Sequence, residues 1–173
     1  LNIPPGIYRE SFAFEKWNDY DEDLFDELYN DQSYEREFKY KIYGSDLSAR
    51  AVNIALDNVK NAGLSKYISV EKKAIHETSA KSNQGVLVTN PPYGERLKSE
   101  NLFDLYGKIG QTLKHRFVGY DAWVISSDKE CLEKIALKPK KKVKLFNAAL
   151  ECSYCHYEIF QGKRKDFMEQ QAL

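Results

Sequence analysis

Residues 86–96 read Val-Leu-Val-Thr-Asn-Pro-Pro-Tyr-Gly-Glu-Arg, and this stretch is the most informative part of the chain. The apolar, β-branched residues at its start are typical of a buried strand, which we place at residues 85–89. The strand must end at the prolines, because neither Pro91 nor Pro92 has a backbone N–H to donate. Asn90 precedes a proline and therefore favours an extended backbone. The sequence thus predicts a rigid polar platform at a strand's carboxyl end, where open α/β sheets bind ligands.

This platform is suited to chemistry on the amino group of a nucleobase. Such a nitrogen is a poor nucleophile, because its lone pair is delocalised into the ring. The Asn90 side-chain oxygen and the Pro91 carbonyl are two acceptors that can accept hydrogen bonds from its two N–H groups and free the lone pair. Tyr93 can stack on a base taken out of its helix, which contributes about 1–3 kcal/mol per base. The alternative is a strand-terminating turn in which Tyr93 only packs, because Asn-Pro and Pro-Pro dipeptides mark turns generally.

The sequence Asn-Pro-Pro-Tyr at residues 90–93 resembles motif IV of the amino-group methyltransferases, which methylate adenine N6, cytosine N4 or guanine N2. The extension Gly-Glu-Arg-Leu at residues 94–97 narrows the resemblance to the RlmL-type bacterial 23S rRNA guanine-N2 methyltransferases, a THUMP-linked family. Residues 43–52 and 147–152 resemble the second motif and the late strand of that family. The resemblance therefore covers most of the chain.

The resemblance implies a cofactor, S-adenosylmethionine, and a set of site residues. It implies that the Asn90, Pro91, Pro92 and Tyr93 platform holds the target amino group and base. It also implies that Asp46, with Ser45 and Asn90, binds the cofactor, Asp46 through the ribose hydroxyls. An acidic residue after a second strand has this role in nucleotide-binding α/β folds for physical reasons. From the residues alone, an N-cap role of Asp46 for the following helix stays equally open.

The alternation of strands and helices predicts a mostly parallel sheet covered by helices. A closing antiparallel hairpin is typical of the Rossmann-like, S-adenosylmethionine-dependent methyltransferase fold. We expect residues 1–173 to be the C-terminal part of such a catalytic domain, with a helical lead-in (1–38), an α/β core (39–162) and a tail (163–173). The periodicity predicts helices at 18–37, 48–61, 101–115 and 129–135, and strands at 40–43, 68–72, 85–89, 122–126, 142–147 and 151–160.

The sequence departs from the family pattern at two places where the family binds the cofactor. The glycine-rich first motif is absent, and the chain begins with Leu, its only methionine being Met168. We therefore expect the family's first strand and helix to lie in an upstream segment of the same protein, which completes the sheet. Without that segment, buried backbone groups would lack hydrogen-bond partners, and each would cost about 1–3 kcal/mol of stability. Near Ala74 the family usually carries an Asp that contacts the adenine. Whether Glu71, Glu77 or His76 replaces it stays open.

Composition restricts the class of protein. The apolar fraction of 42%, the charged fraction of 30% and the mean hydropathy of −0.62 describe a soluble chain. No apolar run approaches a membrane span and the N-terminus is not a signal peptide, so we expect a cytoplasmic protein without membrane contact. The net charge is zero, from 26 basic and 26 acidic residues. RNA contact then requires either segregated charge or RNA affinity from a domain outside this chain. The acidic stretch is 19–37, and the basic clusters at 138–144 and 163–165 fit either phosphate contact or solvated surface.

The spacing of the three cysteines does not indicate a metal site. Cys152, Cys155 and His156 formally match the C-x-x-C-H haem-attachment pattern. We reject a haem, because the surrounding residues are typical of one continuous strand. No second C-x-x-C pair is present for zinc. We expect reduced thiols and no metal.

The sequence thus favours methyl transfer from S-adenosylmethionine to the exocyclic N2 of a guanine in 23S ribosomal RNA. Two alternatives stay open. A DNA adenine-N6 methyltransferase fits the Asn-Pro-Pro-Tyr core but not its extension. A degenerate, non-catalytic RNA-binding module fits the absent glycine motif and Ala74.

Overall fold

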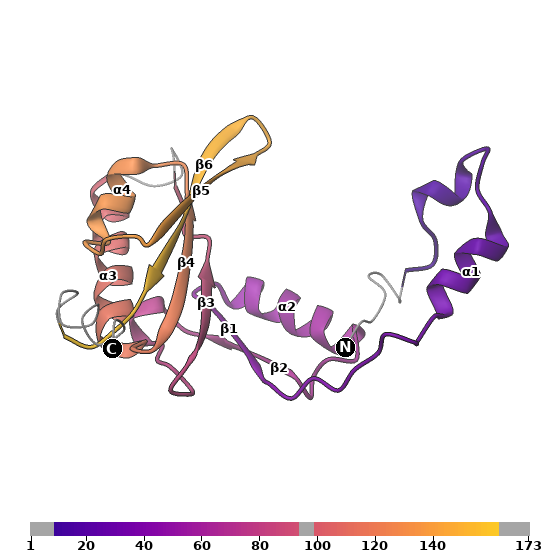
Figure 1. Ribbon diagram of the computed structural model, residues 1–173, viewed down its shortest axis with the longest axis horizontal. Coiled ribbons are helices and arrows are strands. Elements are labelled where there is room, and N and C mark those ends of the chain that lie inside the picture. The colour runs from indigo at the N-terminus through magenta and orange to yellow at the C-terminus, as the bar shows by residue number, and fades with distance from the viewer. Residues whose placement is uncertain (1–8, 94–98, 163–173) are drawn as a thin grey trace, which may run out of the picture. The chain divides into compact units, whose positions relative to one another are not determined.

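The computed structural model describes residues 9–93 and 99–162, which divide into two compact units between Lys72 and Lys73 (Figure 1). None of the helices in this described part is long and apolar enough to cross a membrane. The first unit contains η1 (Ala13–Lys16), α1 (Glu22–Asn30), β1 (Ile42–Asp46), α2 (Ala49–Asn61) and β2 (Ile68–Lys72).

Helix α1 is shorter than the helix predicted at 18–37, which was wrong at both ends. It begins where the side chain of Asp21 accepts the backbone N–H of Leu24 at 2.9 Å. It ends before Asp31, whose carboxylate accepts the backbone N–H of Ser33 at 2.8 Å and turns the chain. The acidic residues thus cap and terminate the helix rather than extend it.

Strands β1 and β2 pair in parallel, with α2 as their connection. Helix α2 begins at the predicted place, where Ser48 caps it by accepting the backbone N–H of Ala51. The strand predicted at 40–43 was misplaced, since pairing with β2 extends through Asp46, opposite Lys72. Gly44 lies within this strand, opposite Val70.

The second unit is an α/β layer built on a four-stranded sheet in the order β3-β4-β6-β5. β3 and β4 are parallel, and β6 runs antiparallel to both β4 and β5. The predicted parallel strands and closing hairpin are therefore confirmed. The elements are η2 (Ile75–Glu77), β3 (Gly85–Thr89), α3 (Ser99–Arg116), β4 (Tyr120–Ser126), α4 (Lys129–Lys134), β5 (Lys141–Asn147) and β6 (Leu150–Glu158).

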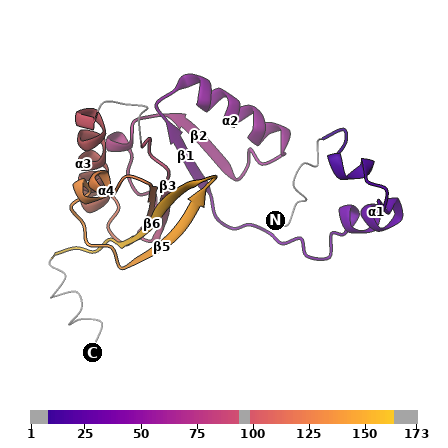
Figure 2. The ribbon, with the colours of Figure 1, turned by 90° about the horizontal axis from the view of Figure 1, so that it is seen from above.

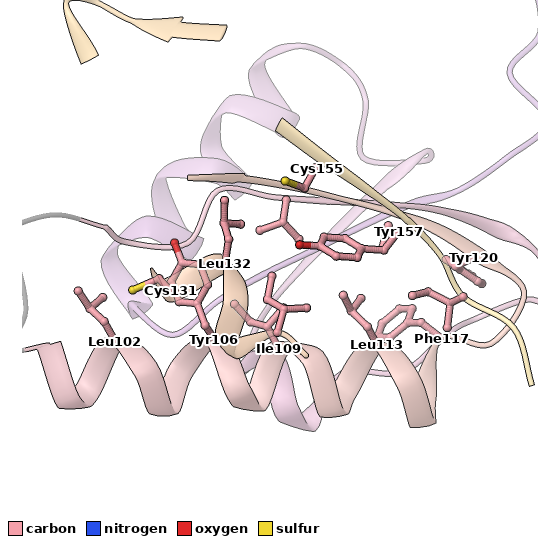
Figure 3. Packing of buried hydrophobic residues seen from close by; sticks show 14 residues of the cluster. Leu102, Tyr106, Ile109, Leu113, Phe117, Tyr120, Cys131, Leu132, Cys155 and Tyr157 are labelled. Carbon is pink, nitrogen blue, oxygen red and sulfur yellow. The ribbon is translucent and has the colours of Figure 1, made fainter. Parts of the chain in front are cut away.

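Helices α3 and α4 cover one face of this sheet (Figures 1 and 2). The apolar residues of α3 recur every three or four positions, so they form one stripe that points at the sheet. Figure 3 shows this stripe packed against side chains of α4 and β6. The buried cluster includes Leu102, Tyr106, Ile109, Leu113 and Phe117 of α3 and its end, and Ala122, Val124, Cys155 and Tyr157 of the strands.

Close packing of α3 against the end of α4 requires a glycine at one position. A Cβ atom on Gly110 would lie 2.0 Å from the carbonyl oxygen of Ile135, whereas one on Gly107 would lie 4.0 Å from that of Lys134. The two glycines share a helix, so only their distance from the neighbouring backbone distinguishes them.

We therefore expect Gly110→Ala to lower the free energy of unfolding by about 1–3 kcal/mol, because the helices must separate. Gly107→Ala is the matched control, and its better helix propensity should leave stability unchanged or raise it by up to about 1 kcal/mol. Urea denaturation of both variants measures the difference. Equal stability of the two variants would contradict the close approach.

Candidate active site

The predicted platform lies directly after β3. The strand ends at Thr89, and Pro91 is buried while Asn90 is exposed. Tyr93 is half-buried. The structure therefore presents the Asn90 side chain to solvent and anchors the chain through the proline that follows it. The extension at residues 94–97 lies outside the described residues.

A buried hydrogen-bond network supports the platform from below. The hydroxyl of Tyr106, in α3, donates to Ser126 Oγ at 2.8 Å and lies 3.4 Å from the carbonyl oxygen of Pro92. Ser126 Oγ in turn accepts the backbone N–H of Asp128 at 3.1 Å. Burial raises the pKa of Tyr106 to about 12, so the phenol is neutral and acts as a donor. The backbone of the platform is thus connected to the core of the second unit.

The β5–β6 hairpin contacts the platform at Tyr93. Asn147, the last residue of β5, donates its side-chain N–H to Tyr93 Oη at 3.1 Å. The sulfur of Cys152, which is buried in β6, lies 3.9 Å from the same oxygen. Sequence reasoning noted the similarity of residues 147–152 to a family segment but assigned no role to these two side chains. The available signal was a polar residue at the end of a strand otherwise rich in lysine.

Two of the three residues predicted to bind the cofactor, Ser45 and Asp46, lie in the first unit, whereas Asn90 lies in the second. Ser45 and Asp46 are exposed at the carboxyl end of β1. One carboxylate oxygen of Asp46 accepts the backbone N–H of Ser48 at 2.7 Å. The helix cap itself is Ser48, so the N-cap alternative for Asp46 is wrong. A carboxylate has two acceptor oxygens, and this one therefore retains capacity for a diol such as a ribose.

The site thus falls into two described parts. Ser45 and Asp46 belong to the first unit, and the platform of residues 90–93 belongs to the second. Near Ala74, the carboxylate of Glu77 accepts the Ala74 backbone N–H at 2.9 Å. This bond favours a local capping role for Glu77.

The cysteine geometry contradicts attachment of a haem. Cys152 and Cys155 are three residues apart on β6, so their side chains point to opposite faces of the strand. Both are buried free thiols. His156 hydrogen-bonds Asp121 at 2.5 Å and stacks on Trp123. Within residues 9–93 and 99–162, no group of three or more His, Cys, Asp or Glu side chains is placed to hold a metal ion.

Comparison with known proteins now identifies the family. Residues 1–156 match the UPF0020 family, described as an RMKL-like methyltransferase domain. The chain belongs to this family. A curated relative is the ribosomal RNA large subunit methyltransferase K/L of Shewanella frigidimarina, 32% identical over 97% of this chain. The chain spans about a quarter (25%) of that relative's length.

Solved structures of similar chains show the Rossmann-like methyltransferase fold. SMU.472, crystallised in complex with SAH, is 29% identical, with a TM-score of 0.78 over 94% of this chain and 43% of that one. A protein from Listeria monocytogenes, described as a predicted N6-adenine-specific DNA methylase, is 31% identical, with a TM-score of 0.59 over 68% of this chain and 30% of that one. The family uses S-adenosylmethionine, and the carboxylate of Asp46 is exposed at a strand end.

The Tyr106 network generates a test of how the platform is supported. Tyr106→Phe removes the hydroxyl and leaves buried Ser126 without this partner, so the free energy of unfolding should fall by about 1–3 kcal/mol. Tyr154→Phe, a half-buried position on the opposite face of the sheet, is the control, with an expected change within about 0.5 kcal/mol. Chemical denaturation at neutral pH compares them. An unchanged Tyr106→Phe variant would show that the network contributes nothing to stability.

Proposed function

We propose that this chain provides the catalytic residues of an enzyme that methylates the exocyclic N2 of a guanine in 23S ribosomal RNA. The Asn90 platform carries the proposal: an exposed amide follows a strand end, and the two prolines beside it have no N–H to compete for the site. The name of the curated relative supports ribosomal RNA as the substrate. The absence of a membrane-spanning helix in the described ranges is compatible with action on RNA in the cytoplasm.

The chemistry follows from two acceptors on one amino group. The Asn90 side-chain oxygen and the Pro91 carbonyl accept hydrogen bonds from the two N–H groups of the guanine amino group and so free its lone pair. Tyr93 stacks on the base and holds it outside the RNA helix. Asp46, with Ser45, holds the ribose hydroxyls of the cofactor. When bound, S-adenosylmethionine would supply the methyl group: the N–C bond would form as the S–C bond breaks, S-adenosylhomocysteine would leave, and the methylated nitrogen would lose one proton to water. Because no base is needed before the nitrogen attacks, positioning by these residues provides most of the acceleration.

A second candidate is methylation of adenine N6 in DNA. The similarity to the Listeria protein favours it, because that protein is described as acting on this group. The Gly-Glu-Arg-Leu extension at residues 94–97 favours guanine. Methyl incorporation into 23S rRNA and into DNA, measured side by side in the full-length protein, separates the two substrates. Calorimetry that detects no binding of S-adenosylmethionine would favour the third possibility, a non-catalytic RNA-binding module.

Asn90→Ala should lower methyl transfer to rRNA by about 10²-fold or more, because the variant loses an acceptor aimed at the reacting nitrogen. Because the side chain of Asn90 is exposed, the variant should keep its fold. Asn53→Ala, at an exposed position of α2, is the control and should keep wild-type turnover. The assay uses full-length protein, labelled S-adenosylmethionine and transcribed 23S rRNA. Wild-type turnover in Asn90→Ala would exclude the proposed role of the platform.

We also propose that an upstream segment of the same protein pairs with β3. In the described part of the chain, β3 pairs only with β4. Leu87 of β3 packs on the core while Val86 and Val88 are 67% and 64% exposed on the other face, so the strand is apolar on both faces, as a central strand is. An apolar strand with an unpaired edge is a liability that proteins cover.

In the full-length protein, the backbone amides of residues 86–88 should therefore exchange with deuterium slowly, as in a paired central strand. Helix α1, whose residues include none that are buried, provides the fast-exchanging reference. Exchange of residues 86–88 as fast as that of α1 would contradict the proposed strand.

A further inference from the structure

We infer that Asn147, at the tip of the β5–β6 hairpin, is a positioning residue for Tyr93. Its amide donates to Tyr93 Oη at 3.1 Å across 54 residues of sequence. This inference rests on the proposed function of Tyr93 as the ring that stacks on the base. It assigns to the hairpin a part in substrate capture, because the orientation of that ring determines whether a base can stack on it.

The hairpin is built to hold the amide in one place. Asn147 pairs with Leu150, so only a two-residue turn separates β5 from β6. Ala148 in that turn has a φ of 52°, a left-handed conformation that is uncommon for alanine. The two ion pairs of the hairpin, Lys140 to Glu158 at 2.8 Å and Lys144 to Glu151 at 2.9 Å, are largely exposed, so the turn and the strand pairing rather than these charges place the amide.

Register determines which hairpin side chain faces Tyr93. Successive side chains of a strand point to opposite faces, and a slip of one residue would exchange them. Asn147 and Cys152 share the face that meets Tyr93. Phe146, which is 65% exposed, lies on the other face beside Lys144. Asparagine is common next to turns, but a turn role does not require a bond to a residue of another element.

The Asn147 amide is the donor toward Tyr93, because the single thiol proton of Cys152 has a nearer acceptor in the Leu150 carbonyl oxygen at 3.6 Å. The Asn147 amide and, at 3.9 Å, the Cys152 thiol approach the phenol oxygen. A phenol accepts through its lone pairs and donates one proton. Asn147 thus restrains the phenol oxygen of Tyr93 and, with it, the orientation of the ring.

A double-mutant cycle in the full-length protein tests this role, with transcribed 23S rRNA and labelled S-adenosylmethionine. Asn147→Ala should raise KM for RNA about two- to tenfold, the range of one neutral hydrogen bond, and leave kcat and the KM for S-adenosylmethionine within about twofold. Tyr93→Phe, which removes the phenol oxygen but keeps the ring, should have a similar effect. The double variant should be no worse than either single variant, because both remove the same bond.

Glu151→Gln is the control, since it breaks an exposed ion pair of the same hairpin and should leave both KM values unchanged. A full additional effect of Asn147→Ala in the Tyr93→Phe background would overturn the inference. So would a fall in kcat and thermal stability without a change in KM for RNA.

Tyr93→Ala separates this inference from the proposed function. If Tyr93→Ala raises KM for RNA while Asn147→Ala does not, base capture by Tyr93 stands and the role of Asn147 is wrong. If Tyr93→Ala leaves KM for RNA unchanged, the role of Tyr93 in base capture and the role of Asn147 are both wrong.

Discussion

Two consecutive prolines end the hydrogen-bond ladder of β3, and the arrangement of the second unit depends on that interruption. Because Pro91 and Pro92 have no N–H, the chain leaves the sheet at one defined point. Pro91 is buried there, which directs the Asn90 side chain outward. A strand that continued for two more residues would pair its backbone within the sheet, and no acceptors would remain for an amino group.

The platform is supported from two directions, and the two supports differ in kind. From the core, Tyr106 connects the Pro92 carbonyl to buried Ser126, so the backbone geometry is linked to the packing of α3 against β4. From the sheet edge, the β5–β6 hairpin reaches Tyr93 with a single amide. In Figure 1 this hairpin extends beyond the end of β4. The first support is rigid and dry, and the second is half-exposed. This difference suits the proposed role of Tyr93, in which the ring would admit a base and then release it.

Much of the second unit was predictable from local pattern. The strand at 85–89 has the predicted bounds, because an apolar run between a glycine and two prolines leaves little freedom. The pattern failed where polar side chains act on the backbone. The helix predicted at 18–37 is only nine residues long, since Asp21 and Asp31 form a cap and a turn that helical periodicity does not reveal. The end of β1 was misplaced because pairing with β2, not local propensity, carries the strand through Asp46.

The resemblance of residues 90–97 to motif IV was enough to predict methyl transfer and its cofactor, and the alternation of strands and helices was enough to predict the fold class, because these features depend on residue type and short spacing. The partners of the site residues were not accessible in this way. Asn147 meets Tyr93 only because β5 and β6 pair in one register, and Tyr106 meets Pro92 only because α3 packs on the sheet. Such contacts join distant segments, so they depend on how the elements pack together, which local sequence patterns do not encode.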